Sequence, residues 1–417
     1  MRQQILEGLT LVVVGVLSAV ATAASGEAAL VRAATGAGSL QALVDRAEPG
    51  HVLELGPGTY AGPVRIDKAL ILRGRGSVID GGGVGTPLVV VAPGVRVEGV
   101  VVQGSGDDVG APDACIYVEP SATGTVLQGN TLRDCAFGIW VHETDGVHIE
   151  GNRIWGRKDV RVTDRGNGIH LFNASHLVVR DNEVRDARDG IYVSVTEDSV
   201  IEDNLAEHVR FGVHYMYSYR NVLRGNVMNH NTLGIALMES HDLIVEDNRA
   251  AGNRRQGLLF RDVRGSQIRR NRLERNGQGM FFYSSTENVI EDNVVQGNEM
   301  GLKIWAGTRR NRIEGNVIRG NREQVFYVGA EDQIWGESGR GNYWGDYLGW
   351  DQDGDGIGDR PHRVDSFAAG LLYRYPSAAL LLRSPALETL SHLADRLPML
   401  RTPTIIDQAP LLGEPES

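Results

Sequence analysis

The middle of the chain repeats one pattern of apolar and polar positions about every 22 residues. Short runs of the form Gly-Ile-x-Val alternate apolar and polar residues with a period of two, which is typical of strands that bury one face. Nine asparagines recur at intervals of 22, 23 or, once, 30 residues, and an aliphatic residue stands three positions before each. These asparagines are Asn130, Asn152, Asn182, Asn204, Asn226, Asn248, Asn271, Asn293 and Asn316.

A column of glycines follows these asparagines by about eight residues, and an apolar residue follows each glycine. The glycines are Gly138, Gly168, Gly190, Gly212, Gly234, Gly257, Gly279 and Gly301. The pattern predicts an all-β right-handed parallel β-helix, in which each repeat is one coil and equivalent residues stack in columns. We expect the asparagines to form an inward ladder of hydrogen-bonded amides and the glycines to mark a bend with unusual φ and ψ.

The two ends of the chain differ from the repeats. Residues 1–24 have the pattern of a secretory signal peptide, with an apolar stretch from Leu9 to Val20 followed by small residues. Residues 25–340 are predicted to form the β-helix, with a helix over Leu40–Ala47 as its cap and a loop over 156–166. Residues 341–370 are predicted to form a Trp- and Asp-rich loop after the β-helix, and 371–417 a helical or extended docking arm.

The chain is rich in glycine, with 53 among its 417 residues, and its net charge is −11. A net acidic chain is a poor candidate for nucleic-acid binding. Two cysteines are too few for a disulfide scaffold or a four-thiolate zinc site. Aligned by the repeat, Cys115 and Cys135 are about three positions out of column, roughly 10 Å at strand rise, so we expect no disulfide between them.

The outward positions between the apolar columns carry histidine, methionine and aromatic residues where solvated strands usually carry Thr, Lys and Glu. His214 and Met216 share one side of a strand, and Met238 is the equivalent of Met216 one coil later. Imidazole with two thioethers is a soft ligand set suited to Cu(I), and His170 and His142 extend it. The alternative is a protein-docking face, for which the candidates are Trp140, Tyr192, Tyr217, Phe281, Tyr283 and Trp305.

The segment from Asp351 to Asp359 resembles the first part of a calcium-binding loop. Its predicted ligands are Asp351, Asp353, Asp355, the Ile357 carbonyl and Asp359. His362 stands at position 12 of the loop, where a bidentate glutamate is expected. The alternative to a calcium site is a solvated acidic turn. Further along, Ser384-Pro385 opens a predicted helix with leucines at helical spacing, Leu387 and Leu390 among them. This helix either caps the last coil or docks another protein.

With these residues considered together, the chain from Ala42 to Leu412 resembles the NosD family of nitrous oxide reductase maturation proteins. The matching motifs are Gly56-Pro-Gly-Thr-Tyr60, Val78-Ile-Asp-Gly-Gly82, Gly166-Asn-Gly-Ile169, Val213-His-Tyr-Met-Tyr217, Gly341-Asn-Tyr-Trp-Gly345 and Tyr375-Pro-Ser-Ala378. The coils alone are weakly specific, whereas the His-Tyr-Met-Tyr strand and the Asn-Tyr-Trp tail are much more specific.

The resemblance implies a periplasmic, non-enzymatic protein associated with an ABC-type transporter of one ATPase and one membrane permease. It also implies work with a copper chaperone to mature the copper centres of nitrous oxide reductase, with Cu(I) handled transiently. It supplies no ligand set. The alternative function is a carbohydrate-binding β-helix, or one that cleaves or epimerises polysaccharides, which would need clustered carboxylates in a wall groove.

Overall fold

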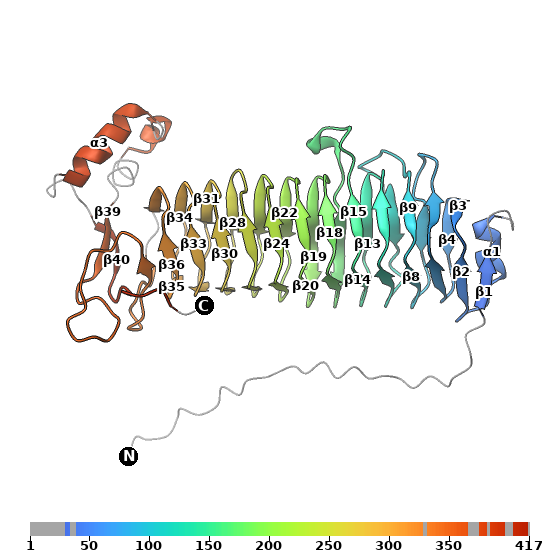
Figure 1. The fold of residues 1–417 in the computed structure, drawn as a ribbon, viewed down its shortest axis with the longest axis horizontal. Helices are drawn as coiled ribbons and strands as arrows, with labels where there is room; N and C mark the ends of the chain where they lie inside the picture. Colours follow the sequence, from blue (N-terminus) through green and yellow to red (C-terminus); the bar gives the residue numbers. More distant parts are fainter. Residues whose placement is uncertain are drawn as a thin grey trace, which may run out of the picture.

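The computed structural model describes residues 30–33, 39–327, 332–365, 375–381, 384–396 and 403–415. The predicted signal peptide lies outside the described residues. The chain winds into a long stack of coils whose walls are three parallel sheets, with few helices (Figure 1). The predicted parallel β-helix is therefore confirmed.

Each coil contributes one short strand to each sheet, and neighbouring strands in a sheet come from successive coils. Sheet A consists of β1 (Leu30–Ala33), β2 (Val52–Leu55), β5 (Ile71–Gly74), β8 (Arg96–Glu98), β11 (Val126–Gln128), β14 (His148–Glu150), β17 (Val178–Arg180), β20 (Val200–Glu202), β23 (Val222–Arg224), β26 (Ile244–Glu246), β29 (Gln267–Arg269), β32 (Val289–Glu291) and β35 (Arg312–Glu314). Sheet B consists of β3 (Gly58–Ala61), β6 (Ser77–Asp80), β9 (Val101–Gln103), β12 (Thr131–Arg133), β15 (Arg153–Trp155), β18 (Glu183–Arg185), β21 (Leu205–Glu207), β24 (Val227–Asn229), β27 (Arg249–Ala251), β30 (Arg272–Glu274), β33 (Val294–Gln296), β36 (Val317–Arg319) and β38 (Tyr343–Trp344). Sheet C consists of β4 (Val64–Ile66), β7 (Leu88–Val90), β10 (Ala114–Val118), β13 (Phe137–His142), β16 (Ile169–Ser175), β19 (Asp189–Glu197), β22 (Phe211–Met216), β25 (Leu233–Met238), β28 (Gln256–Arg261), β31 (Gln278–Tyr283), β34 (Met300–Ile304) and β37 (Glu323–Tyr327).

The apolar columns predicted from the repeat fill the interior of the stack. In sheet A, Leu127 pairs with Ile149, and Ile149 pairs with Val179 in the next coil. All three side chains are fully buried. Because the register is the same from coil to coil, equivalent aliphatic residues lie directly above one another, and the core continues along the whole stack.

The asparagine column forms the predicted ladder inside one corner. From Asn130 to Asn316, each side-chain Nδ2 donates to Oδ1 of the asparagine in the following coil at 2.9–3.0 Å. The ladder passes through Asn342 to Asp407, whose Oδ2 accepts from Asn342 Nδ2 at 3.0 Å and from Trp344 Nε1 at 2.9 Å. Each amide N–H of the ladder needs an acceptor in the next coil. An ionised carboxylate only accepts hydrogen bonds, so Asp407 ends the ladder and leaves no N–H of Asn342 without an acceptor.

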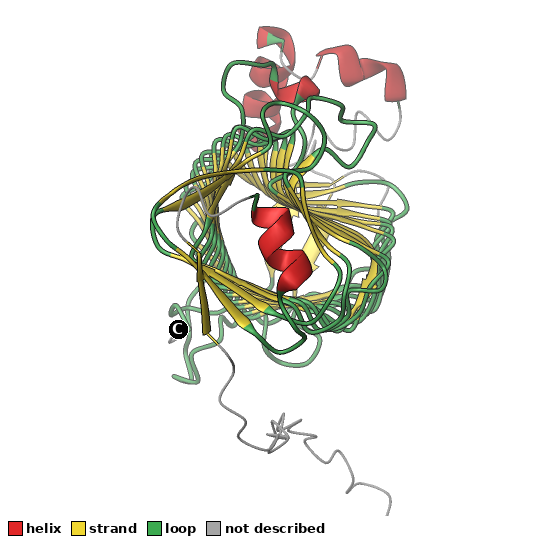
Figure 2. Ribbon diagram, turned by 90° about the vertical axis from the view of Figure 1, so that its right-hand side faces the viewer, coloured by secondary structure: helices red, strands yellow, loops and turns green. Residues whose placement is uncertain are grey.

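Each end of the stack is covered. The helix α1 (Leu40–Arg46) lies across the opening of the first coils, as predicted (Figure 2). At the other end, β39 (His362–Asp365) and β40 (Pro403–Asp407) pair antiparallel, followed in space by η2 (Pro376–Leu381) and α3 (Pro385–Arg396) beyond the last coil (Figure 1). No helix in the described ranges is long and apolar enough to cross a membrane.

The glycine column has a different physical cause from the one predicted. These glycines lie within the strands of sheet C, except Gly168, which directly precedes β16, and none of them has positive φ. A Cβ on Gly138 would lie 2.4 Å from the Gly168 carbonyl oxygen and 2.5 Å from the Ile154 side chain, so close packing excludes a side chain. The left-handed bend is instead at the residue before each ladder asparagine, such as Gly151 (φ 64°) or Asp181 (φ 56°).

The expectation of free cysteines is wrong, because Cys115 and Cys135 form a disulfide with a Cα–Cα distance of 5.5 Å. The expected separation of about 10 Å between the two thiols assumed that the chain between Cys135 and the strand β13 is extended. Asp134 has φ 55°, however, and turns the chain so that Cys135 lies over Cys115 of the preceding coil. The bridge is buried and joins neighbouring coils.

The inserted residues after β15 form the predicted loop, which contains η1 (Val162–Asp164) and rises from the stack (Figure 1). Arg165 fixes the loop through its guanidinium, which donates to the Asp186 carbonyl at 2.7 Å and to the Val160 carbonyl at 2.9 Å. The coils on either side of the loop stay in register, since β13 pairs with β16 and β15 pairs with β18.

We expect Asn226→Ala to lower the free energy of unfolding by about 3 kcal/mol, because it leaves buried donors and acceptors of neighbouring coils unpaired. Asn226 Oδ1 accepts from the backbone and side chain of Asn204, and its Nδ2 donates to Asn248. The matched control is Asn229→Ala, which removes an outward, half-buried amide in the same repeat. Urea denaturation followed by circular dichroism measures both, and equal effects would contradict the role of the ladder.

Glu323, on the last strand of sheet C, gives a pH-dependent prediction. Burial raises the pKa of its carboxyl from 4.5 to about 7 despite the nearby cations Arg322 and Lys303. Because the pKa of this carboxyl is raised in the folded state, the free energy of unfolding of the protein falls as the pH rises from about 4.5 through 7. The total loss is about 3 kcal/mol. Glu323→Gln should therefore match the wild type in urea denaturation at pH 4.5 and be more stable at pH 8. An equal difference at both pH values would contradict this.

Candidate functional site

The outer face of sheet C carries a continuous array of rings between β10 and β22, which we call the imidazole wall. It consists of Tyr117, Phe137, Trp140, His142, His170, Phe172, Tyr192, Phe211 and His214. The Trp140 and His170 rings stack at 4.3 Å, and Tyr192 lies 5.0 Å from His214. The wall faces outward, yet its side chains shield one another, which gives half-buried imidazoles on the outside of the molecule.

His214 is the most buried imidazole of the wall, with 9% of its surface exposed. Its Nδ1 lies 2.9 Å from Oδ2 of Asp189, whereas its Nε2 is buried and has no partner in the described part of the chain. An ionised carboxylate only accepts, so Nδ1 carries the proton and the lone pair of a neutral imidazole is on Nε2. A carboxylate on one nitrogen and a free lone pair on the other is the usual arrangement of a metal-binding histidine.

Two groups that hold His214, Asp189 and Arg210, were not predicted from the sequence pattern. Asp189 begins β19 and is 1% exposed, and Arg210, just before β22, donates Nε and Nη2 to its two oxygens at 2.8 and 2.6 Å. Burial works to raise the pKa of Asp189, but the hydrogen bonds from His214 and Arg210 outweigh it and hold the pKa below its usual value. The available signal was the charge of Asp189 directly before Gly190, because the other coils carry an uncharged residue at this position, such as Phe137, Leu233 or Gln256.

The two predicted thioether ligands lie next to His214. Met216 is two residues further along β22 on the same face, about 7 Å from His214 at strand rise. Met238 pairs directly with Met216 across β22 and β25, and both side chains are half-buried. The register therefore brings His214, Met216 and Met238 to one patch of the outer wall.

His170 and His142 do not share that patch. His170 lies two strands from His214, with β19 between them, a distance of about 10 Å, and His142 lies one strand further away. Burial, followed by the nearby His142, lowers the pKa of His170 to about 4, so it is neutral at physiological pH. Its Nδ1 lies 3.2 Å from Asn167 Nδ2. These two imidazoles belong to the wall but cannot bind the same ion as His214.

Most of the residues predicted for docking occupy the outer face of sheet C, with Tyr217 in the turn directly after β22. Trp140, Tyr192, Phe281 and Trp305 are half-buried there. Tyr217 and Tyr283 are more exposed, at 43% and 41%. Lys303 covers this end of the face, with its Nζ 4.7 Å from the Phe281 ring centroid and 5.0 Å from that of Trp305. On α3, Leu387 is buried, whereas Leu390 is 46% exposed.

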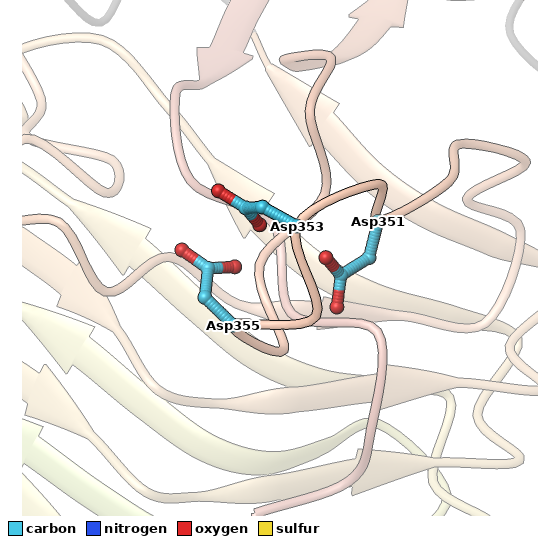
Figure 3. A group of neighbouring side chains, drawn as sticks. All are labelled: Asp351, Asp353 and Asp355. Carbon is cyan, nitrogen blue, oxygen red and sulfur yellow. The ribbon is translucent and has the colours of Figure 1, made fainter.

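The predicted calcium loop brings three carboxylates together between β38 and β39 (Figure 3). An oxygen from each of Asp351, Asp353 and Asp355 lies within 4.8 Å of the others. The Gly356 backbone N–H is the main group that lowers the pKa of Asp351, whereas the charge of Asp355 is the main group that raises the pKa of Asp353. Mutual repulsion of this kind is relieved when a cation binds.

The other predicted calcium ligands are not members of this three-carboxylate group. Asp359 Oδ2 accepts from the Gln352 backbone N–H at 2.8 Å, and Ile357 bridges to Leu411. His362, at the position of the expected glutamate, packs its ring 4.8 Å from Trp344 inside the C-terminal cap. The loop therefore offers three carboxylates and no bidentate glutamate, which is a weak calcium site at most.

Comparisons with known proteins place these features in a family context. The model of a family described as "Periplasmic copper-binding protein (NosD)" matches residues 147–349. Two curated relatives named "Probable ABC transporter binding protein NosD" are 40% identical over 376 residues in Pseudomonas aeruginosa and 38% over 374 residues in Stutzerimonas stutzeri. These alignments cover 87% and 86% of this chain and 88% and 86% of the relatives.

A solved structure shares the architecture at low sequence identity. The Family 28 exopolygalacturonase of Yersinia enterocolitica superposes with a TM-score of 0.50 at 12% identity, covering 74% of this chain and 78% of the enzyme. This likeness shows the fold alone.

We expect calorimetric titration of the full chain to detect Ca²⁺ binding with a Kd of about 10⁻⁴–10⁻³ M. Asp353→Asn should weaken this binding about tenfold or more, since it removes one of the three converging carboxylates. The matched control is Asp346→Asn, which removes an exposed carboxylate of the same segment outside the cluster. An equal effect of both substitutions would show that the loop is only a solvated acidic turn.

Proposed function

The chain belongs to the NosD family of periplasmic copper-binding proteins, and from this premise we propose that it hands copper from a chaperone to apo nitrous oxide reductase. It is a periplasmic accessory protein of an ABC transporter system. In the proposed role it docks the chaperone and the reductase without catalysing a reaction itself, and the ATPase and membrane permease of the same system are its other partners. The proposal includes assembly of the copper centres of the reductase.

The observation that carries the proposal is the unpartnered Nε2 of His214. A buried polar atom without a partner costs about 1–3 kcal/mol, a cost that is removed when an ion binds. His214 stands two residues before Met216 on the same strand, and Met216 pairs with Met238, so the three side chains share one patch of the wall. Soft sulfur ligands with an imidazole suit Cu(I) better than Zn²⁺ or Ca²⁺. We assign these three residues as the copper ligands. His170 and His142 are assigned to neighbouring positions along the wall where copper passes.

Two surfaces are assigned to the protein partners. The outer face of sheet C carries copper at its centre and aromatic residues on both sides, so a chaperone or reductase that covers it would also exclude water from the ion. Tyr283 is an exposed aromatic residue of that face, and Tyr217 is exposed in the turn directly after β22. The helix α3 lies beyond the last coil and exposes Leu390 and Leu393, which suits contact with the permease.

The carbohydrate-active alternative has less support at the wall. Acid–base cleavage of a polysaccharide needs carboxyl groups that reach the substrate. Asp189 is the buried carboxylate of the wall, and Arg210 and His214 occupy both of its oxygens. A sugar ring docked on the aromatic residues would therefore meet imidazoles and arginine rather than a carboxyl group ready to transfer a proton.

The copper site is tested by anaerobic Cu(I) titration against a chromophoric competitor. We expect the wild type to bind Cu(I), and His214→Ala combined with Met216→Ala to weaken binding at least about 100-fold, because two of three ligands are lost. Met238→Ala should weaken it about tenfold. Met300→Ala, a half-buried methionine on β34 of the same sheet, is the matched control and should bind Cu(I) like the wild type.

Binding of the copper chaperone and of apo nitrous oxide reductase is measured on the same proteins by surface plasmon resonance. The wild type should bind both, and Tyr217→Ala should weaken at least one of them without changing Cu(I) affinity. Failure of the wild type to bind copper and either partner, together with turnover of a polysaccharide, would replace the proposal with the carbohydrate alternative. Equal Cu(I) binding by the wild type and the His214/Met216 variant would overturn only the ligand assignment.

A further inference from the structure

The negative charge of Asp189, which accepts a hydrogen bond from His214, is balanced by the positive charge of Arg210. Asp189 accepts Nε and Nη2 of Arg210 at 2.8 and 2.6 Å and Nδ1 of His214 at 2.9 Å, while its side chain is 1% exposed. The Arg210 guanidinium lies 4.4 Å from the Phe211 ring centroid, and that ring lies edge-on to His214 at 4.8 Å. The guanidinium is therefore held between a carboxylate and an aromatic face, and the Asp189–Arg210 pair has no net charge.

This neutrality affects which ions the wall can bind. A carboxylate that accepts from a metal-binding histidine normally adds negative charge to the surroundings of the ion. Here Arg210 cancels that charge, and the remaining donors, the imidazole of His214 and the two thioethers, are neutral. A divalent ion loses much more hydration energy than a monovalent ion on entering such a half-buried site, and the neutralised Asp189 does not offset the loss.

We infer that Arg210 determines the ion specificity of the wall by making the His214 site electrically neutral, so that it selects a monovalent soft cation over divalent transition metals. The inference rests on the proposed copper site at His214. Arg210 acts through Asp189 and does not contact the ion. Asp189 is a positioning residue, because it keeps the proton on Nδ1 and the lone pair on Nε2.

The test compares the affinities of the full-length protein for Cu(I) and for Zn²⁺. Arg210→Met leaves the Asp189 carboxylate uncompensated and should shift the ratio of the two affinities about tenfold or more toward Zn²⁺. Arg210→Lys keeps the positive charge and is the matched control, with a ratio close to that of the wild type. Thermal unfolding of each variant reports whether it is folded.

Two further variants separate charge from disruption of the wall. Asp189→Asn keeps a hydrogen-bond acceptor for His214 but leaves Arg210 unbalanced, so it should weaken Zn²⁺ binding more than Cu(I) binding. The double variant Asp189→Asn with Arg210→Met removes both charges and should restore the ratio of the wild type. If Arg210→Met does not fold, these two variants decide the question.

The outcomes distinguish this inference from the proposed copper site. If His214→Ala abolishes Cu(I) binding but neither Arg210→Met nor Asp189→Asn changes the affinity ratio, the role of Arg210 is wrong and the copper site stands. If His214→Ala binds Cu(I) as tightly as the wild type, the site itself is wrong and the inference fails with it. A ratio that shifts in opposite directions in the two single variants supports the inference.

Discussion

The side-chain amide ladder is the interaction on which the regularity of this molecule depends. Each ladder asparagine uses its N–H groups and its oxygen to join three successive coils, for example Asn204, Asn226 and Asn248. A shift of one residue in any coil would break these bonds and turn the aliphatic columns outward. The ladder therefore fixes the register, and the register determines which side chains meet on the outer walls.

Much of the fold could be predicted because stacking repeats the same requirement in every coil. The spacing of the asparagines and of their aliphatic neighbours was sufficient to identify the coils and the inserted loop. The details that failed depend on local geometry that a linear spacing does not contain. Gly138 is required by a neighbouring carbonyl rather than by its own φ, and Asp134 turns the chain so that Cys135 meets Cys115.

The candidate site could be predicted only in part for a similar reason. His214, Met216 and Met238 share columns that the repeat defines, so the sequence was enough to bring them together. Asp189 is aligned with Phe211 of the next coil, and Arg210 directly precedes Phe211, so the period places the two residues in neighbouring coils. The spacing does not show that the Arg210 side chain turns back onto the carboxylate. The sequence alone also treated His170 and His142 as part of the same set, although strand spacing separates them from His214.

The acceptor-only end of the ladder at Asp407 has a consequence for how such a protein can change its length. Every internal coil offers the same donors and acceptors to its neighbours, so a duplicated coil can be inserted without altering either α1 or the C-terminal cap. Each insertion would lengthen the stack by about 4.8 Å, the strand spacing. The length of the stack can therefore change only by whole coils. The distance between His214 and α3 can evolve in steps of one coil while the two ends remain unchanged.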